Sequence, residues 1–144
     1  FAAFSSYADR DRVQTALTAA LAGLRDRERR LIRIYAPAFL PEERAPGYVS
    51  TYGPGFRENG GQYTHAAVWL ALALHRAGRR EEAATLAEDM ALSLTAPEYG
   101  AEPFVLPADI AYAPGKEGRA GWSWYTGAAG WYLRLLRELY GAEP

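Results

Sequence analysis

The chain has 144 residues, of which 49% are hydrophobic and 23% are charged, and this composition excludes intrinsic disorder and fits one ordinary domain. The net charge is −1 without long runs of like charge, so nucleic acid and anionic membranes are poor partners. The absence of cysteine excludes disulfides and thiolate metal sites, and no apolar run approaches the ~20 residues that cross a bilayer.

The first predicted helix covers Asp9 to Asp26, because apolar residues recur there at spacings of three and four. Asp9 and Asp11 are both candidates for its N-cap. A second short periodic piece, Leu31 to Tyr35, is followed by a proline. A loop rich in proline and glycine then runs to Gly61, and its aromatic residues favour an ordered loop.

The middle of the chain predicts a pair of helices. The stretch from Gln62 to Ala77 is apolar almost all round and stops at Gly78, so this helix is expected to be largely buried. Glu81 to Leu94 is the next predicted helix, and the short link makes the two helices antiparallel. The pair resembles one tetratricopeptide unit, although the sequence has no second copy about 34 residues away.

The last part of the chain begins with an extended stretch, Ala101 to Tyr112, which is interrupted by prolines. A charged, turn-rich loop follows from Gly115 to Gly121, and Trp122 to Tyr140 is the last predicted helix. The chain is therefore predicted to be all-α, with four main helices and two long ordered loops.

Two predicted helix starts carry the candidate site. At the later start, a Thr-Gly pair, Thr126 and Gly127, precedes a helix whose first N–H groups have no internal partners and favour an anion. These residues predict a seat for phosphate or carboxylate. The alternative is simple N-capping by Thr126, with Gly127 and Gly130 allowing close helix packing.

At the earlier start, Gln62 and His65 follow a glycine-rich turn that contains Glu58. A single histidine on an apolar helix can also be a core residue bonded to a carbonyl, and Glu58 can be a solvated loop acid. The two helix starts share donors, glycines and aromatic neighbours, and we expect them to converge on one pocket if both amino termini point the same way.

Three blocks of sequence, GPGFRENGGQYTHAAVW, AEPFVLPADIAYAP and GRAGWSWYTGAAGWYLR, resemble the carboxy-terminal part of the inverting phosphorylases of glycoside hydrolase family 94. The family includes cellobiose and β-glucan phosphorylases and the phosphorylase-like domain of cyclic β-1,2-glucan synthases. The resemblance covers roughly Tyr48 to Leu136, with weaker likeness upstream. It implies that residues 1–144 are a single fragment, the carboxy-terminal part of an (α/α)6 barrel, a toroid of six helical hairpins.

The resemblance also implies an activity and a set of site residues. Inorganic phosphate, the co-substrate, cleaves a β-glucosidic bond with inversion to give α-glucose 1-phosphate, and no cofactor or metal takes part. By resemblance, His65, Thr126 and Gly127 bind phosphate. Glu58 contacts the sugar, Gln62 stands in the same block, and Asp109 is the nearest match to a family glutamine that binds substrate.

The family's general acid, an Asp, and a phosphate-binding Arg belong to segments upstream of these blocks. Because the chain starts at Phe1 rather than at Met, we expect a piece of a larger enzyme that is inactive alone and pairs with the remainder or with itself. Its expected partners are a β-glucan oligosaccharide and phosphate. We expect a cytoplasmic location, with a membrane-bound parent if the chain is of the cyclic glucan synthase type. The alternatives are a non-catalytic carbohydrate-binding module and a helical-repeat interaction module.

Overall fold

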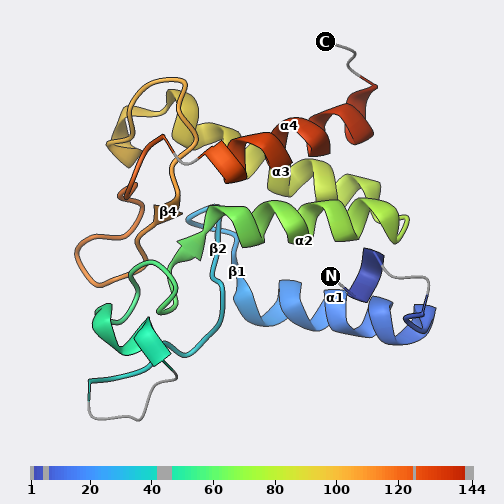
Figure 1. Cartoon of the computed structure of the whole chain (residues 1–144), viewed down its shortest axis with the longest axis horizontal. Coiled ribbons are helices and arrows are strands. Elements are labelled where there is room, and N and C mark those ends of the chain that lie inside the picture. Colours follow the sequence, from blue (N-terminus) through green and yellow to red (C-terminus); the bar gives the residue numbers. More distant parts are fainter. Residues whose placement is uncertain (1, 5–6, 42–46, 125, 142–144) are drawn as a thin grey trace.

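The computed structural model describes residues 2–4, 7–41, 47–124 and 126–141, without the side chains of residues 50, 92–95 and 126. Four α-helices lie side by side, and most of the irregular chain gathers at one end of them (Figure 1). The elements in chain order are η1 (Ala2–Phe4), α1 (Arg10–Leu24), β1 (Arg25–Asp26), β2 (Leu31–Ile32), η2 (Gly47–Thr51), β3 (Gln62–Tyr63), α2 (Thr64–Arg76), α3 (Arg80–Thr95), η3 (Pro97–Tyr99), β4 (Asp109–Ile110) and α4 (Thr126–Tyr140), where η denotes a short 3-10 helix.

Helix α1 starts as its sequence predicts. The side chain of Asp9 accepts a hydrogen bond of 2.9 Å from the backbone N–H of Arg12, which satisfies one of the unpaired donors of the first turn. Of the two predicted caps, Asp9 is therefore the one that the structure confirms. The helix ends where Arg25 adopts an extended conformation and enters β1.

The short piece after α1 is a strand rather than a helical turn. Leu31 and Ile32 form β2, which pairs with β1 in an antiparallel hairpin. Both side chains are buried, and the backbone N–H of Ile32 finds its partner in the side chain of Gln62 instead of along a helix. Periodicity over five residues could not show this, because the partner strand decides the conformation of such a short run.

The helix pair α2 and α3 confirms the predicted antiparallel hairpin (Figure 1). The turn between them contains Gly78 at a φ of 84°, a left-handed conformation that glycine adopts without steric cost. The predicted start at Gln62 is two residues early, since Gln62 and Tyr63 belong to β3 and pair with β4. As predicted, α2 is largely buried.

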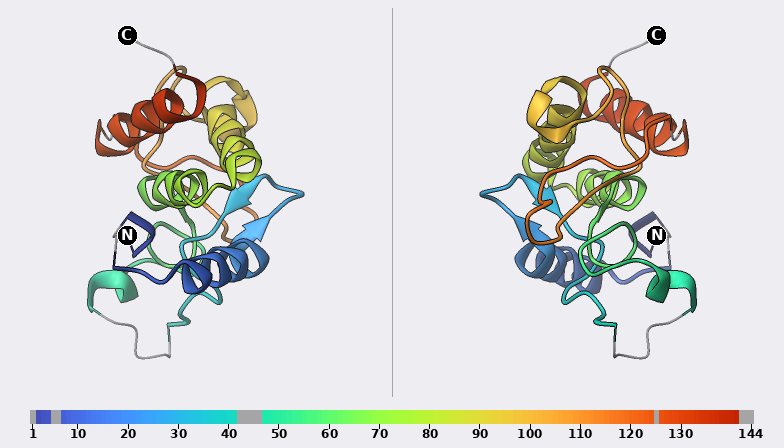
Figure 2. Two further views of the ribbon diagram at one scale, coloured as in Figure 1. Left: turned by 90° about the vertical axis from the view of Figure 1, so that its right-hand side faces the viewer. Right: turned by 90° about the vertical axis from the view of Figure 1, so that its left-hand side faces the viewer.

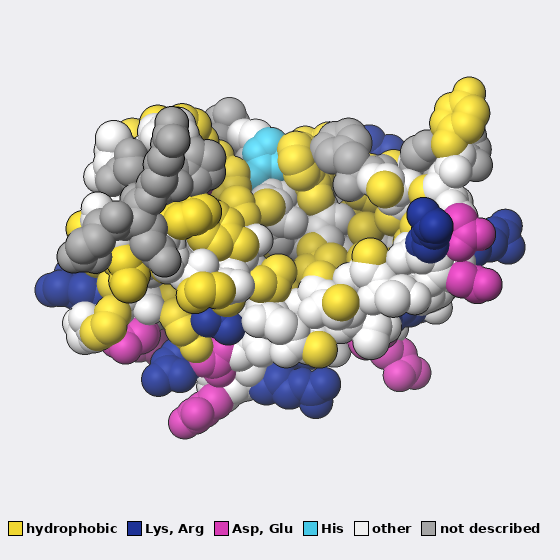
Figure 3. All heavy atoms as spheres, turned by 90° about the horizontal axis from the view of Figure 1, so that it is seen from below, with side chains coloured by type: hydrophobic (Ala, Val, Ile, Leu, Met, Phe, Trp, Pro, Cys, Tyr) yellow, Lys and Arg dark blue, Asp and Glu magenta, His cyan; other side chains and the backbone are white. Residues whose placement is uncertain are grey.

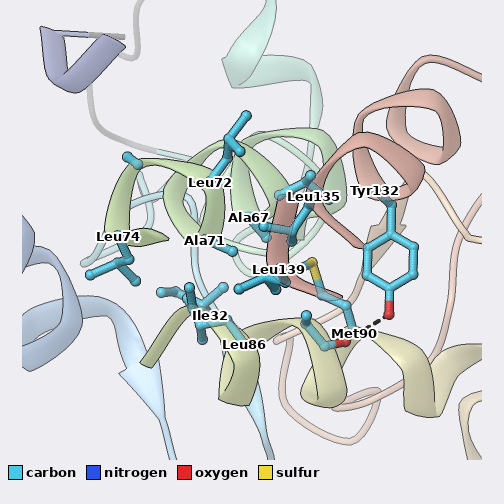
Figure 4. Close-up of a cluster of buried hydrophobic side chains, with 14 of the residues drawn as sticks. Ile32, Ala67, Ala71, Leu72, Leu74, Leu86, Met90, Tyr132, Leu135 and Leu139 are labelled. Carbon is cyan, nitrogen blue, oxygen red and sulfur yellow. Dashed lines mark hydrogen bonds between the residues drawn. The ribbon is translucent and has the colours of Figure 1, made fainter. Parts of the chain in front are cut away.

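The hydrophobic core lies where α2, α3 and α4 meet, with β2 contributing one side chain (Figure 4). Large aliphatic side chains that are at most 2% exposed fill it: Val68, Leu72, Leu74, Leu86, Leu135 and Leu139. The Tyr132 ring packs beside them, and its hydroxyl donates a hydrogen bond of 2.9 Å to the carbonyl of Ala87. Burial of these side chains is the main force that holds the helices together.

Helix α4 begins at Thr126, four residues later than predicted. Trp122 lies in the preceding loop because its carbonyl accepts a hydrogen bond of 2.6 Å from the N–H of Ala108. Trp124 has a φ of 62°, which a right-handed helix cannot contain. The aromatic residues before Thr126 therefore belong to the loops.

The loop end of the molecule covers the start of two helices. In Figure 1 the chain enters both α2 and α4 from the same side, and Figure 2 shows the loops in front of the helix ends in its right-hand view. The described residues thus form a mostly helical unit with the irregular chain at one end. Closure into a six-hairpin toroid stays a prediction.

An apolar groove of about 340 Å³ lies along α1 and α2, with Val13, Trp69 and Leu70 among its lining residues. Hydrophobic side chains gather around a hollow on the face that contains α1 (Figure 3). Self-association through such a surface stays a prediction. No helix in the described part of the chain is long and apolar enough to span a membrane.

Candidate functional site

The structure brings the two predicted helix starts together. A Cβ atom built on Gly127 would lie 3.5 Å from Cε1 and 3.6 Å from Nδ1 of His65. The imidazole ring of His65, in the first turn of α2, therefore faces the first turn of α4 across the place where Gly127 has no side chain. The side chain of Thr126 lies outside the described residues.

His65 stands between two tryptophans, with its ring centroid 4.5 Å from that of Trp69 and 6.3 Å from that of Trp131. Its Nε2 atom is buried and has no hydrogen-bond partner among the described residues. Burial lowers the pKa of His65, so the ring is neutral near pH 7. A neutral imidazole offers one N–H donor, which either of its two nitrogens can carry.

The amino-terminal end of α4 adds donors to the same place. The first backbone N–H groups of a helix have no partners inside it, and the aligned peptide dipoles give that end a partial positive charge. Gly127 is exposed and presents no side chain, so a ligand can approach the backbone closely. Together with His65, this helix end can hold an anion by hydrogen bonds rather than by a full positive charge.

Asp109 occupies a buried notch next to this helix pair. Its residue is 3% exposed, and a Cβ atom on Gly121 would lie 2.3 Å from its Oδ1. Burial raises the pKa of Asp109, while the charge of Arg57 and the backbone N–H groups of Trp122 and Arg57 oppose the shift. Oδ1 has no hydrogen-bond partner within the described chain. Glycine at position 121 is thus required for the carboxyl group to fit.

Arg57 is a site residue that sequence reasoning missed. Its guanidinium carbon lies 3.9 Å from the centroid of the Trp122 ring and 5.1 Å from that of Tyr52. Its Nε donates to Oε2 of Glu58 at 3.4 Å, and its charge faces the buried Asp109. The cation therefore balances two carboxylates. The only sequence feature that could have indicated a role for Arg57 is its position directly before Glu58 in a glycine-rich turn.

Glu58 is partly buried, with 15% of its side chain exposed. Asn59 fixes the turn behind it, since this 2%-exposed amide donates to the carbonyls of Phe39 and Tyr52 at 3.1 and 2.8 Å. The Asn59 Oδ1 atom accepts from the hydroxyl of Tyr35 at 3.0 Å. The polar residues around Glu58 therefore hold the turn in one conformation.

The glycines of the same turn allow backbone segments to touch. A Cβ atom on Gly55 would lie 2.5 Å from the backbone nitrogen of Ala113, and one on Gly61 would lie 2.9 Å from that of Arg57. The turn therefore packs directly against the segment after β4. This close approach explains why a glycine-rich run precedes a buried helix.

Gln62 is 2% exposed, and its Oε1 accepts a hydrogen bond of 2.9 Å from the backbone N–H of Ile32. In this structure its amide links β2 to the start of α2. Its predicted contact with substrate remains untested. The backbone N–H of Thr64 donates to the carbonyl of Ala108 at 2.9 Å, which joins the start of α2 to the segment that carries Asp109.

A pocket of about 330 Å³ opens beside this cluster. Its lining combines a carboxyl group, a guanidinium and aromatic rings, which is the mixture that polyhydroxylated ligands require. Its lining residues are Thr51, Tyr52, Gly53, Phe56, Arg57, Asp109, Gly121 and Trp122. Among the residues that the structure describes, no group of three or more His, Asp or Glu side chains could hold a metal ion.

The sequence profile of the Glycosyl hydrolase 94 superfamily, catalytic domain, matches residues 1–140. The chain belongs to this family. The family 94 match extends beyond the three blocks that carry the resemblance and includes α1 and the β1–β2 hairpin.

A curated relative supports the same assignment. The chain is 43% identical, over an alignment of 136 residues, to the protein named cyclic beta-(1,2)-glucan synthase NdvB of Rhizobium meliloti (strain 1021), and the alignment covers 90% of the chain. It spans 5% of the length of that relative. The predicted family is therefore confirmed, while the activity of the whole relative does not transfer with this short segment.

Proposed function

We propose that the chain forms the phosphate- and sugar-binding part of an inverting β-glucoside phosphorylase of family 94. The observation that carries the proposal is the meeting of the His65 ring with the start of α4 at Gly127. The Cε1–Nδ1 edge of the imidazole and the open end of α4 lie face to face, and together they would form a binding place for an anion. The family match and a relative named as a β-glucan synthase support a glucoside as the second ligand.

In the proposed reaction, an oxygen of phosphate attacks the anomeric carbon while the bond from that carbon to the glycosidic oxygen breaks. A general acid gives its proton to the leaving oxygen, and by family resemblance that acid lies outside this chain. Phosphate replaces the activated water of a hydrolase, so no second carboxylate is needed as a base. The products are α-glucose 1-phosphate and a shortened glucan.

The residues of this chain would position both reactants. His65 and the start of α4 would hold phosphate in line with the anomeric carbon. The entropy cost of bringing the two reactants together would then be met on binding, which lowers the activation barrier. Glu58, held by Arg57, would lie on the sugar side, where a carboxylate stabilises the positive charge of an oxocarbenium-like transition state. The buried carboxyl group of Asp109 would attract the Arg57 guanidinium and keep it in this position.

The test is a phosphate titration of the chain followed by NMR of its two histidine rings. We expect the His65 signals to shift and its pKa to rise, because an anion next to the ring favours the protonated form. His75 lies at the other end of α2 and serves as the internal control. A response of both rings alike, or of neither, would contradict the phosphate site.

Two variants sharpen this test. His65→Gln is expected to weaken phosphate binding by about tenfold or more, the scale of one hydrogen bond to a charged group. His75→Gln is expected to leave it unchanged. The chain alone is expected to release no glucose 1-phosphate from cellobiose or sophorose with phosphate, and clear release would overturn the proposal that it is inactive alone.

A further inference from the structure

The loop end displays aromatic rings that lie largely in solvent. Phe104 is 84% exposed, Trp124 is 70% exposed and Trp122 is 60% exposed. All three belong to the segment between η3 and α4, which forms part of the loop end in Figure 1. Exposed apolar patches that contain large side chains are candidates for binding surfaces.

Glu102 holds one of these rings in place. Its Oε2 accepts a hydrogen bond of 2.7 Å from the indole Nε1 of Trp124 and one of 3.2 Å from the hydroxyl of Ser123. The indole edge is therefore fixed while most of the residue remains in solvent. A side chain with its polar atom already paired can offer its ring to a ligand without losing further freedom.

The backbone supports the same display. Phe104 and Trp124 have φ values of 63° and 62°, in a region that side-chain-bearing residues rarely adopt. Arg57, with a φ of 47°, is the third such residue at this end, and among described non-glycine residues the fourth is Arg30 in the β1–β2 turn. Unfavourable conformations gather at binding surfaces, where the surrounding contacts maintain them.

We propose that Trp124, held by Glu102, and Phe104, two residues after Glu102 in the chain, form a glucan-binding surface for sugar units beyond the reacting bond. The proposal rests on the proposed function, since the chain that crosses this surface would be the glucan substrate. A pyranose ring has an apolar face of C–H groups and a rim of hydroxyls. The exposed rings would pack against the C–H face, and the Glu102 carboxylate would accept hydrogen bonds from hydroxyls.

The chemistry of this surface favours a sugar over another protein. Apart from Trp69, the apolar groove along α1 and α2 is lined by small and aliphatic residues such as Val13 and Leu70, which suits a packed helix. The surface around Glu102 instead combines rings with a carboxylate and a hydroxyl. Trp122, two residues before Trp124 in the chain, lines the pocket beside Asp109.

The test is calorimetric titration of the 144-residue chain with linear β-1,2-glucan oligosaccharides, from the disaccharide to the hexasaccharide. We expect affinity to rise with length in the parent chain. Trp124→Ala should weaken binding of the longer oligosaccharides by about fivefold and affect the disaccharide little. Tyr140→Ala, which removes a 54%-exposed ring at the opposite end of α4, is the control and should change nothing.

Variants at Glu102 test whether its hydrogen bond to the Trp124 indole contributes to glucan affinity. Glu102→Ala should weaken binding of the longer oligosaccharides, because it removes the acceptor that fixes the indole. Glu102→Gln keeps an oxygen acceptor and should restore part of the affinity. Equal loss in both variants would show that the negative charge, and not the tether, matters, and would contradict the positioning of Trp124 by Glu102.

The outcomes distinguish this proposal from the proposed function. If phosphate binds at His65 but affinity for oligosaccharides is absent or independent of length and of Trp124, the glucan surface is wrong and the phosphate site stands. If phosphate does not bind, the proposed function fails, and a length-dependent affinity that is lost in Trp124→Ala would still support the surface. If Trp124→Ala alters only self-association in sedimentation, the surface is a protein interface and the proposal is overturned.

Discussion

The four helices bury mostly aliphatic side chains, whereas the loop end also buries polar groups that belong to the candidate site. In the helical part, Leu72 and Leu135 are fully buried and belong to the hydrophobic core. In the loop end, Asn59 and Asp109 are buried at 2% and 3% exposure, and Arg57 is held between aromatic rings. Stability and ligand binding therefore depend on different residues, and substitutions can affect one without the other.

The largest effect on stability is expected from Leu72→Ala in the helical core. The residue is 0% exposed, and its removal leaves a cavity that costs about 2–5 kcal/mol of unfolding free energy. Urea denaturation followed by circular dichroism measures the loss. Leu133→Ala, at a 52%-exposed position of α4, is the matched control and should change stability by about 0.5 kcal/mol or less. Similar losses of unfolding free energy in both variants would contradict the burial of Leu72 and the exposure of Leu133 in this structure.

Gly121→Ala is expected to damage the loop end with a smaller effect on global stability. The new methyl group would overlap the carboxyl group of Asp109, at roughly 1–3 kcal/mol for overpacking, and should lower the affinity for oligosaccharide. Gly130→Ala makes the same chemical change in α4, where nothing lies within 4 Å of the added atom. That control should gain about 0.5–1 kcal/mol, because alanine favours a helix. If Gly121→Ala bound sugar normally, the conclusion that Asp109 needs a glycine at position 121 would be wrong.

The smallest effect is expected at Asp26, near the surface of the β1–β2 hairpin. A backbone N–H of Arg29, the hydroxyl of Tyr112 and the Arg29 side chain lower the pKa of Asp26 to about 2. A carboxyl group whose pKa is lowered by folding stabilises the protein above its unfolded pKa near 3.8, and this contribution is lost as pH falls through about 2.

Asp26→Asn should therefore cost about 1 kcal/mol or less at pH 6 and progressively less as the pH falls from about 4 to 2. Unfolding midpoints measured across this interval give the difference. Tyr112→Phe removes one of the hydrogen bonds and should show part of the same pH dependence. An unchanged pH profile in Asp26→Asn would show that the hairpin does not depend on this carboxylate.

Regular patterns in the sequence were sufficient for the helical part. The cap at Asp9, the antiparallel pair α2 and α3, and the stop at Gly78 each follow from local rules on spacing, capping and glycine. The short strands β2 and β3 could not be predicted in this way. A two-residue strand is too short to show a periodic pattern, and the partner of β3 also lies far away in the sequence, as with Gln62 and Ile110.

The sequence predicted several residues of the candidate site, but it did not predict the contacts between its loop segments. Helix-start chemistry and the family resemblance pointed to His65 and Gly127, and the structure places them face to face. The sandwich of Arg57 between Trp122 and Tyr52, and the burial of Asp109 against Gly121, depend on loop segments that meet only in the folded chain. Loop packing of this kind leaves no periodic signal in a single sequence.

The aromatic neighbours of His65 also give the molecule an optical reporter. Trp69 and Trp131 lie with ring centroids 5.8 Å apart, and the imidazole is 4.5 Å from Trp69. A protonated imidazole quenches the fluorescence of an adjacent indole more strongly than a neutral one does. An anion that charges His65 would therefore dim the emission, and the occupancy of the seat at α4 could be followed without any label.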